Sequence, residues 1–346
     1  MAEVLFEEVG PNGNLQAVVE SDGDVCYFYL FGASDTDFGM KSVWIRNHAA
    51  APESLDVERM QEGTPPPNPM PFCRHPEGLP IPEADDLHVV WLPEGNGVAL
   101  YESNQILAII PPWSGSGGFD GYASECIGDG PVAWELSPDN VLLQRFEEAQ
   151  SYWDKWDDSD LWPSTQASLL SRLEATFGPH SNYYAIDGGN WPPKAIIRIP
   201  QKDCVILTTI GVSLRPQPCV EMSTETPEVL RRIELGAVLP AKWSDADIKK
   251  FAAYLSAQST LPWTTYSWLG PGHTIPCDSW RNSNFEFALL MNAHPAIPQV
   301  SLGEQFGDPV SLLWFVPLTE AESQTAIDEG SEQVAEHLPR RRWLEA

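Results

Sequence analysis

The spacing of apolar residues changes near residue 137, and this change limits what the chain can fold into. Before it, short stretches rich in Val, Ile, Tyr and Trp are separated by turn sequences such as 21–24 and 94–97. After it, apolar residues recur at helical spacing. Side chains alternate faces along a strand, whereas residues three or four apart share a helix face. We therefore predict an α+β protein, with a β-rich domain over residues 1–136 and a mixed α/β domain over residues 137–346.

Six strands are predicted in the first domain, and the last three should form an antiparallel meander. A proline-rich segment, residues 63–71, lies among them and suits neither a helix interior nor a central strand. We interpret it as an ordered connector, with a ligand for an aromatic groove as the alternative. The predicted strands are Leu15–Glu20, Val25–Phe31, Ser42–Arg46, Leu87–Leu92, Gly97–Tyr101 and Gln105–Ile110.

Capping signals predict where the helices of the second domain begin. Ser137, followed by Pro138 and Asp139, should cap a first helix, and Ser164 a second one that ends at Gly178. Ser244 with Asp247, and Thr319 with Glu322, have the spacing of capping boxes, and Gly330 should interrupt the last helix. Strands are predicted between these helices, at Ala195–Ile199, Cys204–Ile210, Ile233–Leu239, Phe285–Met291 and Ser311–Pro317.

The charge is strongly negative and unevenly distributed. The chain has 49 acidic and 20 basic residues, a net charge of −29. Residues 1–143 hold 23 acids against four bases, Lys41, Arg46, Arg59 and Arg74, a net of −19. Such a field repels nucleic acid and acidic membrane surfaces and speeds association with a basic partner, although acidity also keeps a protein soluble.

Targeting and cysteine patterns indicate a cytoplasmic protein. The first eight residues carry acids where a signal peptide has bases, and the apolar runs are too short for a membrane span. The six cysteines lie at least 15 residues apart, so there is no CxxC knuckle. We expect reduced, mostly buried thiols, and we expect neither a metal nor a cofactor.

The motifs that suggest catalysis are weak. The glycine-rich segment 115–118 precedes no helical pattern and is a poor phosphate loop. The acid pairs 85–86 and 157–158 suit glycoside hydrolysis in principle, because that reaction needs two carboxyl groups, but we interpret them as solvated surface. We therefore predict no catalytic residues and no enzyme.

One loop has a histidine in a suggestive setting, and we single out Trp268, Gly270, Gly272 and His273 as structural loop residues. His273 precedes Cys277 by four residues, a pair that suggests nucleophilic or metal chemistry. The segment is rich in glycine and proline, which does not fix a nucleophile and a base together. We predict instead that His273 bonds the backbone of a tight loop and contacts no metal.

Several motifs resemble the suppressor of fused family in order and spacing. They lie at 205–213, 232–235, 261–263, 272–275 and 309–322, and the resemblance runs from about residue 145 to 338. The first half is similar to the N-terminal extension of bacterial members, at 27–29, 43–47, 108–113 and 134–136.

The resemblance implies a non-catalytic binding protein. The animal suppressor of fused holds a transcription factor through a peptide inserted as a strand between two domains, and bacterial relatives are regarded as immunity proteins that neutralise toxins. The C-terminal domain of the animal protein has no counterpart here, so no peptide-binding residue is carried over.

Three hypotheses follow for function. The first is a bacterial immunity-type protein that neutralises a basic toxin, since nuclease toxins are basic in order to bind phosphate. The second is a regulatory module that binds an extended peptide at a sheet edge or groove. The third, from another class, is an acidic, tryptophan-rich hydrolase acting on sugars, which requires a deep pocket with two carboxyl groups. The partner's identity, its contact residues, the domain that binds it and the oligomeric state stay open.

Overall fold

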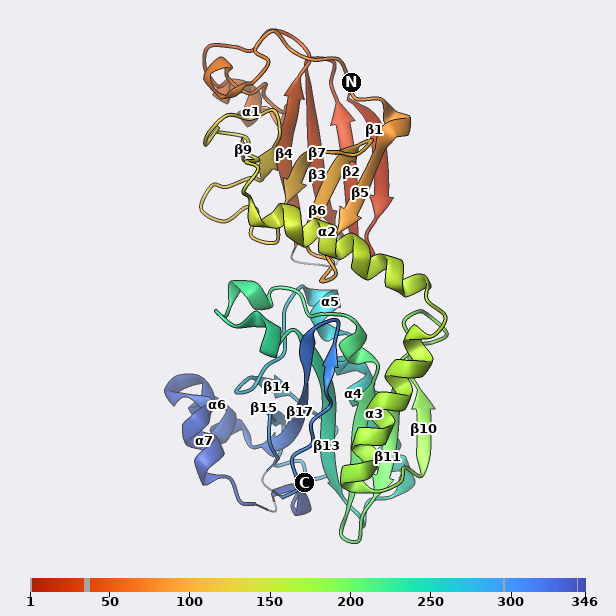
Figure 1. The fold of residues 1–346 in the computed structure, drawn as a ribbon. Coiled ribbons are helices and arrows are strands. Elements are labelled where there is room, and N and C mark those ends of the chain that lie inside the picture. Colours follow the sequence, from red (N-terminus) through yellow and green to blue (C-terminus); the bar gives the residue numbers. More distant parts are fainter. Residues whose placement is uncertain (1, 34–37, 295, 341) are drawn as a thin grey trace. The chain divides into compact units, whose positions relative to one another are not determined.

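Two compact units make up the computed structural model, which describes residues 2–33, 38–294, 296–340 and 342–346 (Figure 1). The first unit extends to Lys155 and includes Trp263–Tyr266, and the second contains the rest. The sequence analysis placed the helix after residue 137 in the second domain. Its buried side chains Leu142, Phe146 and Ala149 instead pack in the first unit, against Val90, Leu92, Ala99 and Ile109.

The first unit is a three-layered arrangement of two sheets and a helix. Alternate residues of the second sheet explain the layers, because Leu100 and Ala108 enter the core shared with the first sheet while Ala99 and Ile109 face helix α2. The meander β5–β6–β7 is antiparallel, as predicted. One sheet has the order β1-β2-β3-β4 and the other β5-β6-β7-β8-β9. The bounds are β1 (Glu3–Val9), β2 (Leu15–Ser21), β3 (Val25–Gly32), β4 (Met40–Asn47), α1 (Val57–Gln61), β5 (Leu87–Trp91), β6 (Val98–Glu102), β7 (Gln105–Ile110), β8 (Tyr122–Ala123), β9 (Trp134–Glu135) and α2 (Val141–Asp154).

The second unit is an eight-stranded mixed sheet with helices on both faces. Its strand order is β10-β11-β12-β13-β17-β15-β14, with β16 paired to β17, and β13 and β17 run parallel. Trp314 of β17 lies in the core under α3, whereas the next residue, Phe315, meets Tyr254 of α4. The bounds are α3 (Leu161–Phe177), β10 (Asn182–Ala185), β11 (Ala195–Pro200), β12 (Cys204–Ile210), β13 (Arg232–Pro240), α4 (Asp245–Gln258), β14 (Thr274–Pro276), β15 (Phe287–Met291), β16 (Glu304–Gln305), β17 (Asp308–Leu318), α6 (Glu320–Glu329) and α7 (Ser331–His337). The short helix α5 (Leu261–Thr265) is divided between the units, because Trp263–Tyr266 belong to the first.

Two of the four predicted helix starts are correct. Both capping boxes form, at Ser244 and Thr319. The cap at Ser137 is wrong, because Asn140 caps α2 by accepting from the backbone N–H of Leu142. The cap at Ser164 is also wrong, since α3 already begins at Leu161.

Two further observations concern cysteines and hydropathy. All six cysteines are free and five of them are buried, as the sequence analysis expected. Among the described residues, no helix combines the length and the apolar character that crossing a bilayer requires.

Candidate functional site

The candidate site is a groove in the first unit, over the face of β3 that carries aromatic side chains. The strand period places Tyr27, Tyr29 and Phe31 on this face, while Phe28 and Leu30 are fully buried. The three rings form a stack, with centroids 5.9 Å apart for Tyr27 and Tyr29 and 5.6 Å apart for Tyr29 and Phe31. The groove has a volume of about 740 Å³.

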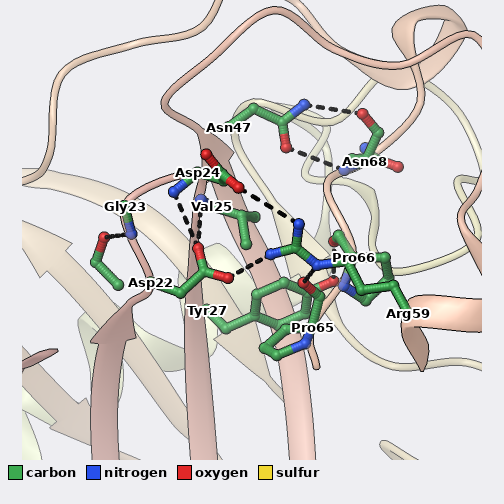
Figure 2. A network of polar contacts seen from close by, with 11 residues as sticks. Asp22, Gly23, Asp24, Val25, Tyr27, Asn47, Arg59, Pro65, Pro66 and Asn68 are labelled. Atoms are coloured by element: carbon green, nitrogen blue, oxygen red, sulfur yellow. Dashed lines mark hydrogen bonds and ion pairs between the residues drawn. The ribbon is translucent and has the colours of Figure 1, made fainter. Parts of the chain in front are cut away.

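Residues 63–66 of the proline-rich segment 63–71 form one wall of the groove, and hydrogen bonds hold this segment in place (Figure 2). The Asn47 side chain donates to the Asn68 carbonyl oxygen at 2.8 Å and accepts from the Asn68 N–H at 3.0 Å. The Tyr27 hydroxyl donates to the Pro66 carbonyl oxygen at 2.7 Å. This segment is an ordered connector, as predicted, and it encloses an aromatic groove of the same unit.

Asp22 and Arg59 anchor this wall to the turn between β2 and β3 (Figure 2). The Arg59 guanidinium pairs with Asp22 and donates to the Pro65 carbonyl oxygen at 3.0 Å. The other Asp22 oxygen accepts from the backbone N–H groups of Asp24 and Val25, both at 3.0 Å. Asp22 is therefore fully engaged in structure, although it lines the groove.

Asp120 also lines the groove, and no basic side chain of the described residues pairs with its carboxylate. Asp120 follows the glycine-rich segment 115–118. A hydrogen bond from the Gly115 N–H to the Phe119 carbonyl oxygen, at 2.7 Å, closes the turn before Asp120. Within the described ranges no group makes a hydrogen bond or ion pair with the Asp120 carboxylate. Burial raises the pKa of Asp120 from 3.8 to about 6.

Tyr29 is a second polar group with unused bonding capacity. Its side chain lines the groove and the residue is only 7% exposed. No hydrogen bond reaches its hydroxyl from the part of the chain that the structure describes, in contrast to the hydroxyl of Tyr27. Burial, and then the charges of Glu20 and Asp22, raise the pKa of Tyr29 well above its usual value.

The four basic residues of the stretch 1–143 are all engaged in contacts within the protein. Lys41 donates to the Pro112 carbonyl oxygen at 2.7 Å and lies over the ring of Phe38. The three arginines pair with carboxylates, namely Arg46 with Glu102, Arg59 with Asp22 and Asp24, and Arg74 with Glu135. The excess of acids therefore dominates the electrostatic field of this unit.

The loop singled out from the sequence lies in the second unit, against β15. The Gly272 N–H donates to Leu290 and the Leu290 N–H donates to the His273 carbonyl oxygen, both at 2.8 Å. A Cβ on Gly270 would lie 2.2 Å from the Trp268 ring, so this position requires glycine. The rings of Trp268 and His273 meet edge to face at 4.4 Å.

The electrostatics of this loop do not favour a nucleophile. Burial lowers the pKa of His273, and a hydrogen bond to the Trp268 backbone opposes that effect. Burial raises the pKa of the Cys277 thiol to about 11, so little thiolate is present at neutral pH. The described residues contain no group of three or more histidine, cysteine, aspartate or glutamate side chains that could hold a metal ion.

The structure brings the four singled-out loop residues together, but it does not bring them to the groove. The sequence analysis missed the groove altogether. The one signal was the alternation of aromatic residues at 27, 29 and 31, which was used only to predict a strand.

Comparison with known proteins finds a similarity in the C-terminal part of the chain. Residues 190–344 match the family model described as "Suppressor of fused protein (SUFU)". The chain is therefore similar to the suppressor of fused family over less than half of its length. A structure search finds "the Sufu-Fu complex crystal structure", with a TM-score of 0.37 and 16% identity over 52% of this chain and 88% of that chain. No curated protein matches.

The region that matches the family model contains a buried carboxylate. Glu234 of β13 is 0% exposed and accepts from Thr209 and from the Ser213 hydroxyl, both at 2.6 Å, and from the N–H groups of Gly211 and Ser213. The motif at 205–213 therefore forms β12 and the turn that surrounds Glu234. This arrangement explains why a carboxylate tolerates complete burial.

Proposed function

We propose that this protein binds another protein through its acidic first unit and that the partner is basic. The observation that carries the proposal is the charge balance of residues 1–143, where 23 acids face four bases that are all engaged. The similarity to the suppressor of fused family supports it, because this is a protein-binding family. We further propose an immunity-type role, in which a bacterial protein neutralises a toxin in the cytoplasm.

The physical basis is complementarity of charge. A nuclease toxin carries a basic surface because it must bind phosphate, and an acidic protein can cover that surface. The field of the first unit would also raise the rate of encounter with such a partner.

Peptide capture at a sheet edge is the second candidate function. The observation that favours it is β10, an edge strand of the eight-stranded sheet on which Asn182, Tyr183 and Ala185 are exposed. An extended peptide can add to such an edge through main-chain hydrogen bonds.

Hydrolysis of sugars is less well supported by the groove. This chemistry needs two carboxyl groups that are free to act on one bond. Three carboxylates line the groove, Glu20, Asp22 and Asp120, and Asp22 is engaged with Arg59 and with the β2–β3 turn. The described residues of the lining include tyrosines but no tryptophan, and this favours binding over hydrolysis.

Co-expression tests the proposed function. The protein encoded by the adjacent reading frame is expressed in a bacterial host alone and together with this chain, and growth and co-purification are measured. The proposal predicts growth arrest by the neighbour alone, rescue by this chain, and a complex that co-purifies. Arrest that persists, without a complex, would contradict the immunity role.

A further inference from the structure

The groove over β3 contains two polar groups that make no hydrogen bond or ion pair with the described residues. Asp120 presents a carboxylate without a counter-ion among the described residues, and Tyr29 presents a hydroxyl without a partner among them. The cation that touches the groove wall, Arg59, is bound to Asp22 and Asp24. A carboxylate in partly apolar surroundings gains most from an opposite charge that it can bond directly.

We propose that this groove binds an arginine or lysine side chain from an extended segment of a partner protein, with Asp120 as its counter-ion. The inference rests on the proposed function. It adds where the basic partner binds, namely the groove over β3, and which group binds it, namely the Asp120 carboxylate.

The lining suits a basic side chain better than a small cation. Arginine and lysine carry long apolar stems that pack on apolar surface while the charged head reaches a polar group. Phe31, Met40 and Met60 supply apolar surface, and Met40 and Met60 are 60% and 44% exposed. Asp120 supplies an anion at the same groove, and Glu20 adds a further carboxylate to the lining.

The length of the groove floor suits an extended segment. Tyr27 to Phe31 is a stretch of five residues, and its four steps along the strand span roughly 13 Å at the rise of a β-strand. A partner segment of similar length would cover the whole aromatic stack. The Tyr29 hydroxyl can then donate to, or accept from, the backbone of that segment.

Short peptides test the inference directly. The probes are acetylated, amidated pentapeptides of sequence Gly-Thr-Xaa-Thr-Gly, in which Xaa is arginine, lysine, norleucine or glutamate. Binding to the full chain is measured by NMR titration. We expect the arginine or the lysine peptide to bind at least about tenfold more tightly than the norleucine peptide, since only a basic head can pair with Asp120. The glutamate peptide should bind most weakly.

Matched variants distinguish direct binding at Asp120 from attraction by the overall negative charge of the protein. Asp120→Asn should reduce the affinity for the basic peptides to that of norleucine, whereas Asp85→Asn removes the same charge from an exposed position and should change it by less than about twofold. Tyr29→Phe should weaken binding about threefold or more, because the hydroxyl is lost. Thermal unfolding of each variant verifies that it is folded.

Several results would overturn the inference. They are equal binding of the norleucine and basic peptides, equal loss in Asp120→Asn and Asp85→Asn, or no binding of any peptide. If the adjacent-frame protein still forms a complex after such a result, only the groove assignment fails. If the peptides bind at Asp120 but that protein forms no complex, the proposed immunity role fails and the groove assignment stands.

Discussion

Asn47 binds both backbone polar groups of Asn68 with one side chain. Asn47 lies at the end of β4 and Asn68 in the proline-rich segment, and both are buried. Prolines cannot donate backbone hydrogen bonds, so this segment depends on such side-chain contacts for its place. The pair thereby fixes one wall of the candidate groove.

Replacement of Asn47 by alanine should destabilise the protein by about 2–4 kcal/mol, because the Asn68 N–H and the Trp44 indole N–H both lose their buried acceptor, the Asn47 side-chain oxygen. The free energy of unfolding is measured with urea, and limited proteolysis reports on residues 63–71. Asn284→Ala, at an exposed position, is the control and should change stability by less than about 0.5 kcal/mol. Equal effects of the two substitutions would contradict the role given to Asn47.

Asp120→Asn should stabilise the free protein at neutral pH, although it removes the proposed binding group. The folded-state pKa of about 6 lies above the ordinary 3.8, so the folded state binds more protons between these values. Stability is therefore highest below about pH 4 and falls as pH rises to about 6. Because the carboxyl is partly exposed, we expect a gain of only about 1 kcal/mol at pH 7.5, seen as a higher Tm. A lower Tm would indicate that Asp120 has a structural role.

Glu234→Ala should cost about 3–5 kcal/mol, because four donors lose their buried acceptor. Glu234→Gln retains one acceptor oxygen and should cost less. Burial raises the pKa of Glu234, so its protonation stabilises the fold and this contribution is lost as pH rises through the folded pKa. The glutamine variant should flatten that pH dependence, and urea unfolding at several pH values measures it. An unchanged profile would contradict this account of the buried carboxylate.

His273→Ala should cost about 1–3 kcal/mol, because the loop loses a hydrogen bond and a ring contact with Trp268. His273→Phe retains a ring beside Trp268, so comparison of the two variants isolates the hydrogen bond. Urea unfolding gives both values. A bound metal ion at His273 and Cys277, detected by elemental analysis of the purified protein, would contradict the structural role that we expect for this loop.

The sequence predicted those elements whose local pattern agrees with their final environment. Strong alternation located β2, β3 and β5–β7, and reciprocal side-chain caps located α4 and α6. It missed β1, where Glu3, Glu7 and Glu8 interrupt the apolar pattern because the strand lies at an exposed edge.

Contacts between residues far apart in the chain could not be predicted from the sequence. The parallel pairing of β13 with β17 joins residues 78 positions apart, such as Arg232 and Val310, and no local signal specifies it. The groove is similar, because residue 120 meets a strand near residue 29 only after folding. Charge counts identified an acidic unit, but they did not identify Asp120 as an acid without a counter-ion among the described residues.

The rate of association with the adjacent-frame protein tests the central claim most directly. Stopped-flow fluorescence measures association and dissociation rates of the full chain between about 50 and about 500 mM salt. If the acidic unit attracts a basic partner, the association rate should fall by about tenfold or more over this range while dissociation changes far less. An association rate that does not depend on salt would contradict the claim and leave the charge as a determinant of solubility.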